Sequence, residues 1–134
     1  MIDHLSITVT NLDRSTQFYG AVMAALGYPE VKRTESSIGY GVRCSAEDFS
    51  GSYISIVASD RVVADRRHWC FQAPTRAAVD RFHRDAVAAG GRDDGPPGLH
   101  PRYHPQYYAA FVLDPDGNRI EAVCHARPDG ESAF

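Results

Sequence analysis

Two histidines and one glutamate are the residues of this sequence best suited to binding a metal ion. His4 stands near the start of the chain, His68 in the middle, and Glu121 near the end, between the apolar residues Ile120 and Ala122. An unpaired carboxylate among apolar neighbours is costly to bury, so a positively charged partner is expected there. Two imidazoles and a carboxylate bind divalent metals while leaving coordination positions open for water or substrate. We therefore predict one divalent metal ion, which could be iron, manganese, cobalt, nickel or zinc, held by His4, His68 and Glu121.

An internal repeat is the reason for treating these residues as a set, because each of them alone is more often an ordinary surface side chain. Moving the sequence along itself by 68 − 4 = 64 positions superposes identical residues. The matched pairs are His4 with His68, Phe18 with Phe82, Ala24 with Ala88, Ala25 with Ala89, and Gly27 with Gly91. The two histidines thus occupy equivalent places in two similar halves.

Each half has the same predicted order of elements. Alternating apolar and polar residues at 5–9 and 69–73 predict a half-buried strand. A helical apolar pattern follows each strand, with Asn11 or Asp13 capping the first helix, Thr75 capping the second, and glycines ending both. Further strands are expected at 31–35, 39–44 and 53–58, weakly near 92, and at 108–113 and 119–124, with a tight turn at 114–118. The order βαβββ, repeated, predicts an α+β fold: one domain spanning 1–134, made of modules at roughly 1–62 and 66–126.

Strand alternation predicts that the three candidate ligands share a face. The apolar positions of each first strand must face the helices, so His4 and His68 point to the opposite side. On the last strand, Ile120 and Ala122 suit the helix side, which places Glu121 with the histidines.

The segment 95–108 is unusually long, with many prolines and aromatic residues, for a connection between strands. Such a segment often covers a site, but a proline-stiffened surface loop is an equally good interpretation. As a lid, it would bring Arg102 to an anionic group of the substrate. Tyr107 or Tyr108 would then hydrogen-bond the substrate, and His104 could act as an acid or base near neutral pH.

Two residues on the predicted histidine face complete the candidate substrate-binding set. Arg119 could attract a carboxylate or phosphonate, although its place beside the turn is also typical of an exposed residue. Gln72 lies on the same face as His68. Glu121 could serve as a catalytic base only by loosening from the metal.

Composition excludes several classes of protein. The chain has 134 residues, 43% of them hydrophobic, and a formal charge of −3 without a stripe of Lys or Arg, which argues against a nucleic-acid partner. No apolar stretch is long enough to cross a membrane, and the N-terminus lacks the features of a signal peptide. An odd set of cysteines without CxxC spacing indicates reduced, structural thiols: Cys44, Cys70 and Cys124. We expect a cytoplasmic protein.

Three segments, IDHLSITVTNLDRSTQFY, HWCFQAP and FVLDPDGNRIEAV, together resemble the vicinal-oxygen-chelate superfamily of glyoxalases, bleomycin-resistance proteins and extradiol dioxygenases. The resemblance covers nearly the whole chain. It implies paired βαβββ modules whose curved mixed sheet surrounds a metal-binding cleft, with the helices outside. It also implies ligand roles for His4, His68 and Glu121, a small-molecule substrate chelated through its oxygens to the metal, and a homodimer.

The reaction stays open at this stage. Glyoxalase I enzymes also use a carboxylate on the last strand of the first module, and residues 53–58 contain none, which argues against a lactoylglutathione lyase. The leading hypothesis is a metal-dependent enzyme, either a glyoxalase-like lyase or isomerase or a dioxygenase. The alternatives are a ligand-sequestering protein like the bleomycin-resistance proteins, and a fosfomycin-type thiol transferase.

Overall fold

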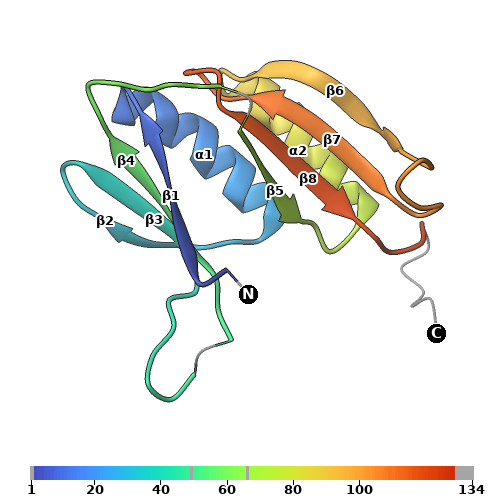
Figure 1. Ribbon diagram of the computed structural model, residues 1–134, viewed down its shortest axis with the longest axis horizontal. Helices are drawn as coiled ribbons and strands as arrows, with labels where there is room; N and C mark the ends of the chain where they lie inside the picture. Colours follow the sequence, from blue (N-terminus) through green and yellow to red (C-terminus); the bar gives the residue numbers. More distant parts are fainter. Residues whose placement is uncertain (1, 49, 66, 129–134) are drawn as a thin grey trace.

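The chain folds as two successive βαβββ modules, as the sequence predicts (Figure 1). The structure, a computed structural model, describes residues 2–48, 50–65 and 67–128. The first module comprises β1 (His4–Val9), α1 (Leu12–Leu26), β2 (Glu30–Arg33), β3 (Ser37–Gly41) and β4 (Tyr53–Ala58). The second comprises β5 (His68–Gln72), α2 (Arg76–Ala88), β6 (Arg92–Leu99), β7 (Tyr108–Leu113) and β8 (Arg119–Cys124).

Each module forms its own four-stranded mixed sheet, and the two sheets have equivalent topology. The strand orders are β1-β4-β3-β2 and β5-β8-β7-β6. The outer pairs β1–β4 and β5–β8 are parallel, and the remaining neighbours are antiparallel. The expected α+β class is confirmed. The strands belong to two sheets that do not close, so β1 and β5, which carry the two candidate histidines, are edge strands of different sheets.

Both helices begin at their predicted capping residues, and α1 ends at its predicted glycine, whereas the C-cap of α2 is Ala89, one residue before the predicted glycines. The Asn11 side chain accepts a hydrogen bond from the Arg14 backbone N–H at 3.0 Å, and the Thr75 hydroxyl accepts one from the Ala78 N–H at 3.0 Å. Gly27 ends α1 with φ of 83°, a left-handed conformation that favours glycine. These local signals determine where each helix begins, and therefore where the preceding strand, which carries a candidate histidine, ends.

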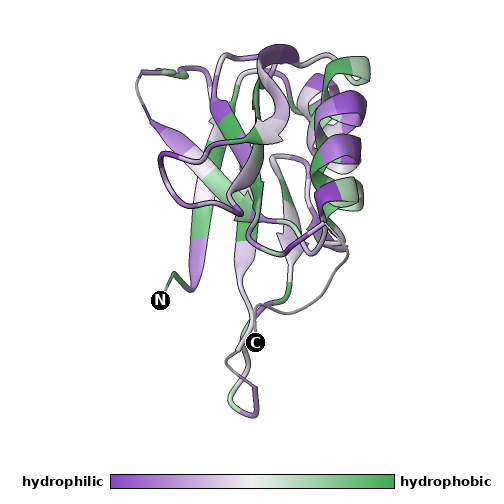
Figure 2. Ribbon diagram, turned by 90° about the vertical axis from the view of Figure 1, so that its right-hand side faces the viewer, coloured by the Kyte–Doolittle hydropathy of each residue, from purple (hydrophilic) through white to green (hydrophobic). Residues whose placement is uncertain are grey.

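The hydrophobic core lies between the two sheets and the two helices, which pack against each other. Figure 2 shows the helices on one side of the molecule and the strands on the other. Gly91 lies at a close approach between the modules, because a Cβ there would lie 2.5 Å from the Phe18 ring. One continuous core holds both modules, so the relative placement of the two sheets is set by helix packing.

The turn between β7 and β8 also ties the modules together. Asp114 is 1% exposed, and its carboxylate accepts the Tyr19 hydroxyl of α1 at 2.6 Å and the backbone N–H groups of Asp116 and Asn118 at 2.8 Å. Asp116 in turn accepts the Thr10 hydroxyl at 2.5 Å. The sequence predicts the turn, but its acidic side chains act as inter-module links that the pattern did not indicate.

The main difference from the predicted elements is the length of β6. The sequence indicated a weak strand near 92 followed by a connection at 95–108, whereas β6 runs to Leu99 and only 100–107 connect it to β7. β6 contains Pro96 and Pro97 because it is an edge strand, and its pairing with β7 is interrupted twice. β2 and β3 lie slightly earlier than expected, at 30–33 and 37–41. Within the described residues, no helix is both long and apolar enough to cross a membrane.

Candidate functional site

The site lies on the face of the second sheet that points away from the helices. Ile120, Ala122 and Cys124 of β8 belong to the main core, whereas Val123 packs in a separate small cluster with Phe111 and Ala109. Glu121 stands beside Phe111 of β7 and Cys70 of β5 in the strand register. The predicted division of β8 into a helix face and a histidine face is therefore correct.

Glu121 is the chemical centre of this face. The residue is 3% exposed, which is unusual for a glutamate, and its carboxylate has partners on both oxygens. The Tyr107 hydroxyl donates to Oε1 at 2.5 Å, and His68 Nε2 lies 3.4 Å from Oε2. The His68 side chain is 45% exposed and lines the cavity beside Glu121, so it can reach a ligand there as well as the carboxylate.

The environment of Glu121 keeps the thiol of Cys70 and the hydroxyl of Tyr107 protonated. Desolvation raises the pKa of the Cys70 thiol to about 12, and the negative charge of Glu121 adds to the shift. The pKa of Tyr107 is raised further, first by desolvation and then by its hydrogen bond to Glu121. Both residues therefore remain hydrogen-bond donors at neutral pH, and Glu121 is the group positioned to offer an anionic oxygen to a cation.

Above Glu121 opens a cavity of about 410 Å³. Its lining residues are His68, Asp94, Gly95, His100, Arg102, Tyr103, Tyr107, Phe111, Arg119 and Glu121. Three of the predicted substrate-binding residues lie here: Arg102, Tyr107 and Arg119. Sequence reasoning missed Phe111 and Asp94; the period of two along β7 could have found Phe111, but no signal marked Asp94.

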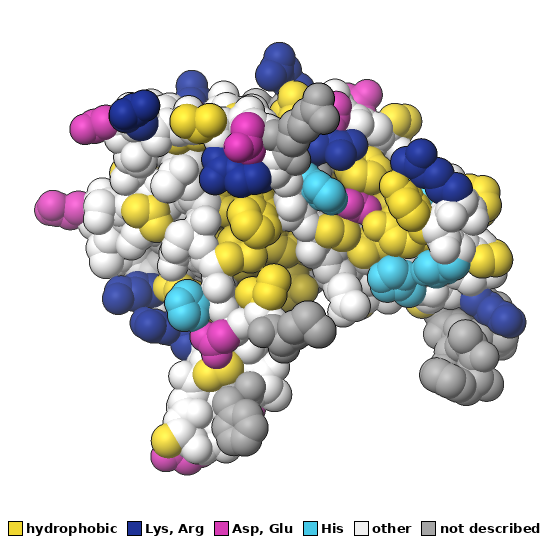
Figure 3. Space-filling model, in the orientation of Figure 1, with side chains coloured by type: hydrophobic (Ala, Val, Ile, Leu, Met, Phe, Trp, Pro, Cys, Tyr) yellow, Lys and Arg dark blue, Asp and Glu magenta, His cyan; other side chains and the backbone are white. Residues whose placement is uncertain are grey.

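The two arginines of the cavity are held differently. Arg119 forms an ion pair with Asp94 at 2.7 Å and lies 4.5 Å from the centre of the Phe111 ring. Arg102 lies over the Tyr103 ring at 4.8 Å and donates to its hydroxyl at 2.8 Å. Figure 3 shows histidine and charged side chains among hydrophobic ones on this half of the molecule, and an apolar hollow next to it.

His4 is not brought to this cavity. It lines a separate depression of the first module with Arg43, Tyr53 and Ser55, and its Nδ1 lies 2.6 Å from the Asp3 carboxylate. Within residues 2–48, 50–65 and 67–128, no group of three His, Cys, Asp or Glu side chains is arranged to hold a metal. Within one chain His4 therefore lies apart from His68 and Glu121, because β1 and β5 belong to different sheets, and the shared ligand role of the three residues stays a prediction.

Three other predicted residues also lie elsewhere. Tyr108 donates its hydroxyl to Asp80 of α2 at 2.6 Å, because adjacent strand residues point to opposite faces and Tyr107 occupies the site face. His104 hydrogen-bonds His125 at 2.8 Å between ring nitrogens and does not line the cavity. Gln72 lines the apolar hollow between the modules, together with Leu5, Ile54 and Phe71. In this chain these three residues therefore lie outside the lining of the cavity above Glu121, and the catalytic roles of Tyr108 and His104 and the substrate-binding role of Gln72 stay predictions.

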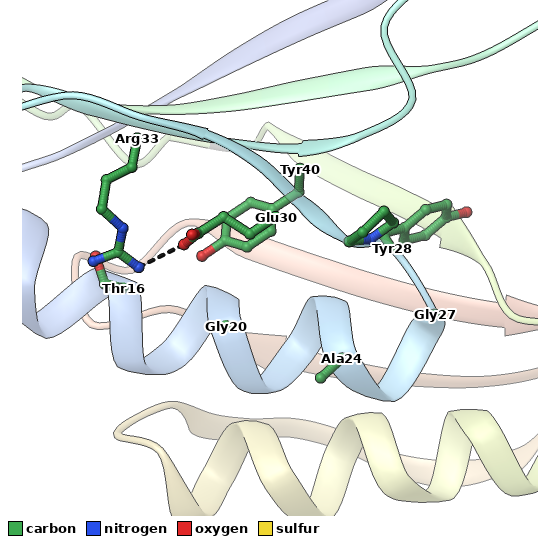
Figure 4. A pocket seen from close by; sticks show the side chains of 9 residues that line it. Thr16, Gly20, Ala24, Gly27, Tyr28, Glu30, Arg33 and Tyr40 are labelled. Carbon is green, nitrogen blue, oxygen red and sulfur yellow. Dashed lines mark hydrogen bonds and ion pairs between the residues drawn. The ribbon is translucent and has the colours of Figure 1, made fainter.

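A further cavity lies between α1 and the β2–β3 hairpin (Figure 4). Its polar groups include Arg33 and Glu30, which form an ion pair with each other at 2.5 Å. Small residues of α1, Gly20 and Ala24, form one side. The lining of this cavity contains no histidine or cysteine.

Comparison with known proteins gives one family. The model of the Glyoxalase/Bleomycin resistance protein/Dioxygenase superfamily matches residues 1–122. The uncharacterized protein YqjT of Bacillus subtilis is 28% identical, over 90% of this chain and 95% of its own. A solved structure of a glyoxalase/bleomycin resistance protein from Albidiferax ferrireducens is 28% identical, with a TM-score of 0.78, over 92% of this chain and 98% of its own. The fosfomycin resistance protein FosX from Mesorhizobium loti is 16% identical, with a TM-score of 0.64, over 92% and 91%, which shows the fold alone.

Proposed function

Because the chain belongs to the Glyoxalase/Bleomycin resistance protein/Dioxygenase superfamily, we propose that it is a metal-dependent enzyme acting on a small molecule. The observation that carries the proposal is the pair formed by His68 and the nearly buried Glu121 at the bottom of a cavity. The ion, when bound, would supply a Lewis acid that polarises substrate oxygens.

The distance between these two side chains fits shared coordination of one ion. Two ligand atoms about 2.0–2.1 Å from a tetrahedral ion stand about 3.4 Å apart. His68 Nε2 and Glu121 Oε2 are 3.4 Å apart. Tyr107 holds the other carboxylate oxygen at 2.5 Å, and this contact fixes the direction of Oε2 in the way that hydrogen bonds orient metal ligands.

We propose that His4 of a second copy supplies the third ligand. Every second residue of β1 and of β5 is exposed, including His4 and His68. On the face of each sheet that points away from the helices, these two strands are therefore not covered by other parts of a single chain. The Asp3 carboxylate engages Nδ1 of His4, which leaves Nε2 as the ligand atom in the usual carboxylate–histidine arrangement. A homodimer with a two-fold axis would then hold two identical sites.

The cavity residues have separate roles in this proposal. Tyr107 positions Glu121, and its raised pKa keeps it a donor through the neutral range. Arg119, fixed by Asp94, places a guanidinium on the wall where an oxygen of the substrate can accept from it. Tyr103 and Tyr107 of the connection 100–107 form the aromatic wall beside the two ligands.

Elemental analysis of protein purified without a tag tests the ligands directly. We expect about one divalent ion per chain in the wild type and a strong loss in His68→Ala and Glu121→Gln. His83→Ala is the matched control, because His83 pairs with Asp93 on the helix side, away from the cavity. Wild-type metal content in either ligand variant would remove that residue from the site. No metal even after reconstitution would leave the ligand-sequestering function as the better explanation.

A mixing experiment tests the second copy. His4→Ala and His68→Ala should each lack metal when expressed alone. Coexpression of the two variants should restore part of the metal content, because a mixed dimer rebuilds one complete site from the intact His4 of one chain and the intact His68 of the other. If both single variants lose metal and coexpression restores none, the three ligands come from one chain.

A further inference from the structure

The wall of the cavity above Glu121 is a connected group of aromatic rings. Tyr103 and Tyr107 have ring centres 4.8 Å apart. His100 meets Tyr107 edge-on at 6.2 Å and Phe111 edge-on at 5.6 Å. Ring faces and edges at these distances attract a further flat aromatic group through offset or edge-to-face packing. The shape of this wall favours a planar ligand over a bulky saturated one.

The cavity also offers one guanidinium that has no anionic partner. Of the two arginines, Arg119 is paired with Asp94 at 2.7 Å. Around Arg102, none of the Asp and Glu residues in the described parts of the chain lies within 4.0 Å, the limit for an ion pair. Its contacts are the face and the hydroxyl of Tyr103. An arginine that lies over an aromatic ring but keeps donors free is well placed to bind a carboxylate through two hydrogen bonds.

The net charge of the cavity also favours an anionic ligand. Arg102 and Arg119 balance Asp94 and Glu121, so any divalent ion bound at Glu121 leaves the cavity positive. A positive cavity with partly apolar walls concentrates anions.

From the ring wall and the unpaired guanidinium, we propose that the cavity binds a small planar aromatic carboxylate. The ring lies against Tyr103 and Tyr107, the carboxylate binds Arg102, and the opposite edge of the ring faces His68 and Glu121. This assignment rests on the proposed function for the direction in which the ligand points. The preference for a flat anion rests on the cavity wall and Arg102 and does not require the metal.

Matched pairs of probes separate charge, planarity and metal. Benzoate and benzamide have the same shape and differ in charge, and cyclohexanecarboxylate keeps the charge without the flat ring. Calorimetric titration of the wild-type protein, both as purified and after removal of metal with a chelator, should show benzoate binding about tenfold more tightly than either analogue. Arg102→Gln should remove the preference for benzoate over benzamide. Arg81→Gln, which changes an exposed arginine of α2, should retain it.

Equal affinities for benzoate and benzamide in both forms of the wild type would overturn the proposal, and so would an unchanged preference in Arg102→Gln. Equal affinities for benzoate and cyclohexanecarboxylate would overturn the aromatic part. A second pair of probes, 3,4-dihydroxybenzoate and 3,4-dihydroxybenzamide, tests the metal. In the metal-loaded protein each should bind more tightly than its counterpart without hydroxyls, benzoate or benzamide, and this gain should disappear after the chelator removes the metal. If the dihydroxy pair shows no gain in the metal-loaded protein, or keeps its gain after the chelator, the metal site is refuted, and the preference for an aromatic carboxylate still stands.

Discussion

Removing the hydroxyl of Tyr107 is the sharpest test of how Glu121 is positioned. The change Tyr107→Phe deletes a 2.5 Å hydrogen bond to a carboxylate that is 3% exposed. Hydrogen bonds to charged groups contribute about 1.5–3 kcal/mol, and partial exposure of Tyr107 puts this one near the lower end. We expect the metal-free protein to lose about 1.5 kcal/mol of its free energy of unfolding. For a domain of this size, such a loss lowers the melting temperature by roughly 5 °C.

The effect on metal affinity should be larger than this loss of stability suggests. Partners that orient a metal ligand typically contribute a factor of about 10–100 to affinity. Competition between Tyr107→Phe and a chelating dye for zinc should therefore show weaker binding by that factor. Tyr108→Phe is the control, because it removes the same group from the next residue, whose hydroxyl binds Asp80 on the opposite side of the sheet. Equal metal affinity in the two variants would refute the positioning role of Tyr107.

Two further predictions concern the contacts that join the modules. Tyr19→Phe removes a buried 2.6 Å bond to Asp114 and should cost about 1.5–2 kcal/mol in urea denaturation with an unchanged m-value. Burial and the charge of Asp114 raise the pKa of Tyr19 well above 10, so its unfolded form ionises first. The contribution of Tyr19 to the free energy of unfolding is therefore full below about pH 10 and is lost as the pH rises above it. Above pH 10 the stability of Tyr19→Phe should fall less steeply with pH than that of the wild type, and an identical slope would contradict the assignment. Gly91→Ala would bring a Cβ to 2.5 Å from Phe18 and should destabilise by about 1–3 kcal/mol, whereas Gly98→Ala, with its nearest atom at 4.0 Å, should be tolerated. Similar melting temperatures for the two alanine variants would show that the modules can separate at no cost.

Features that depend on neighbouring residues were predictable from the sequence. Asn11 and Thr75 cap the helices as expected, since a cap depends on contacts within a few residues. The faces of β1, β5 and β8 follow from alternation, because successive strand residues point to opposite sides whatever the strand packs against. Alternation also predicts that Tyr107 and Tyr108 point to opposite faces of the sheet. It could not tell which of the two faces the site, because that requires knowing which side of β7 packs against the helices.

The sequence by itself determined the two βαβββ modules, the ends of their helices, and the face on which His68 and Glu121 stand. Only the tertiary structure decided that β1 and β5 lie in different sheets, which separates His4 from the other two residues, and that Tyr107 and Arg102 line one cavity with Glu121. The physical reason is the range of the interactions. Alternation and capping act within a few residues, whereas the placement of one sheet against the other depends on packing between α1 and α2 and on links such as Tyr19 to Asp114, which join distant parts of the chain.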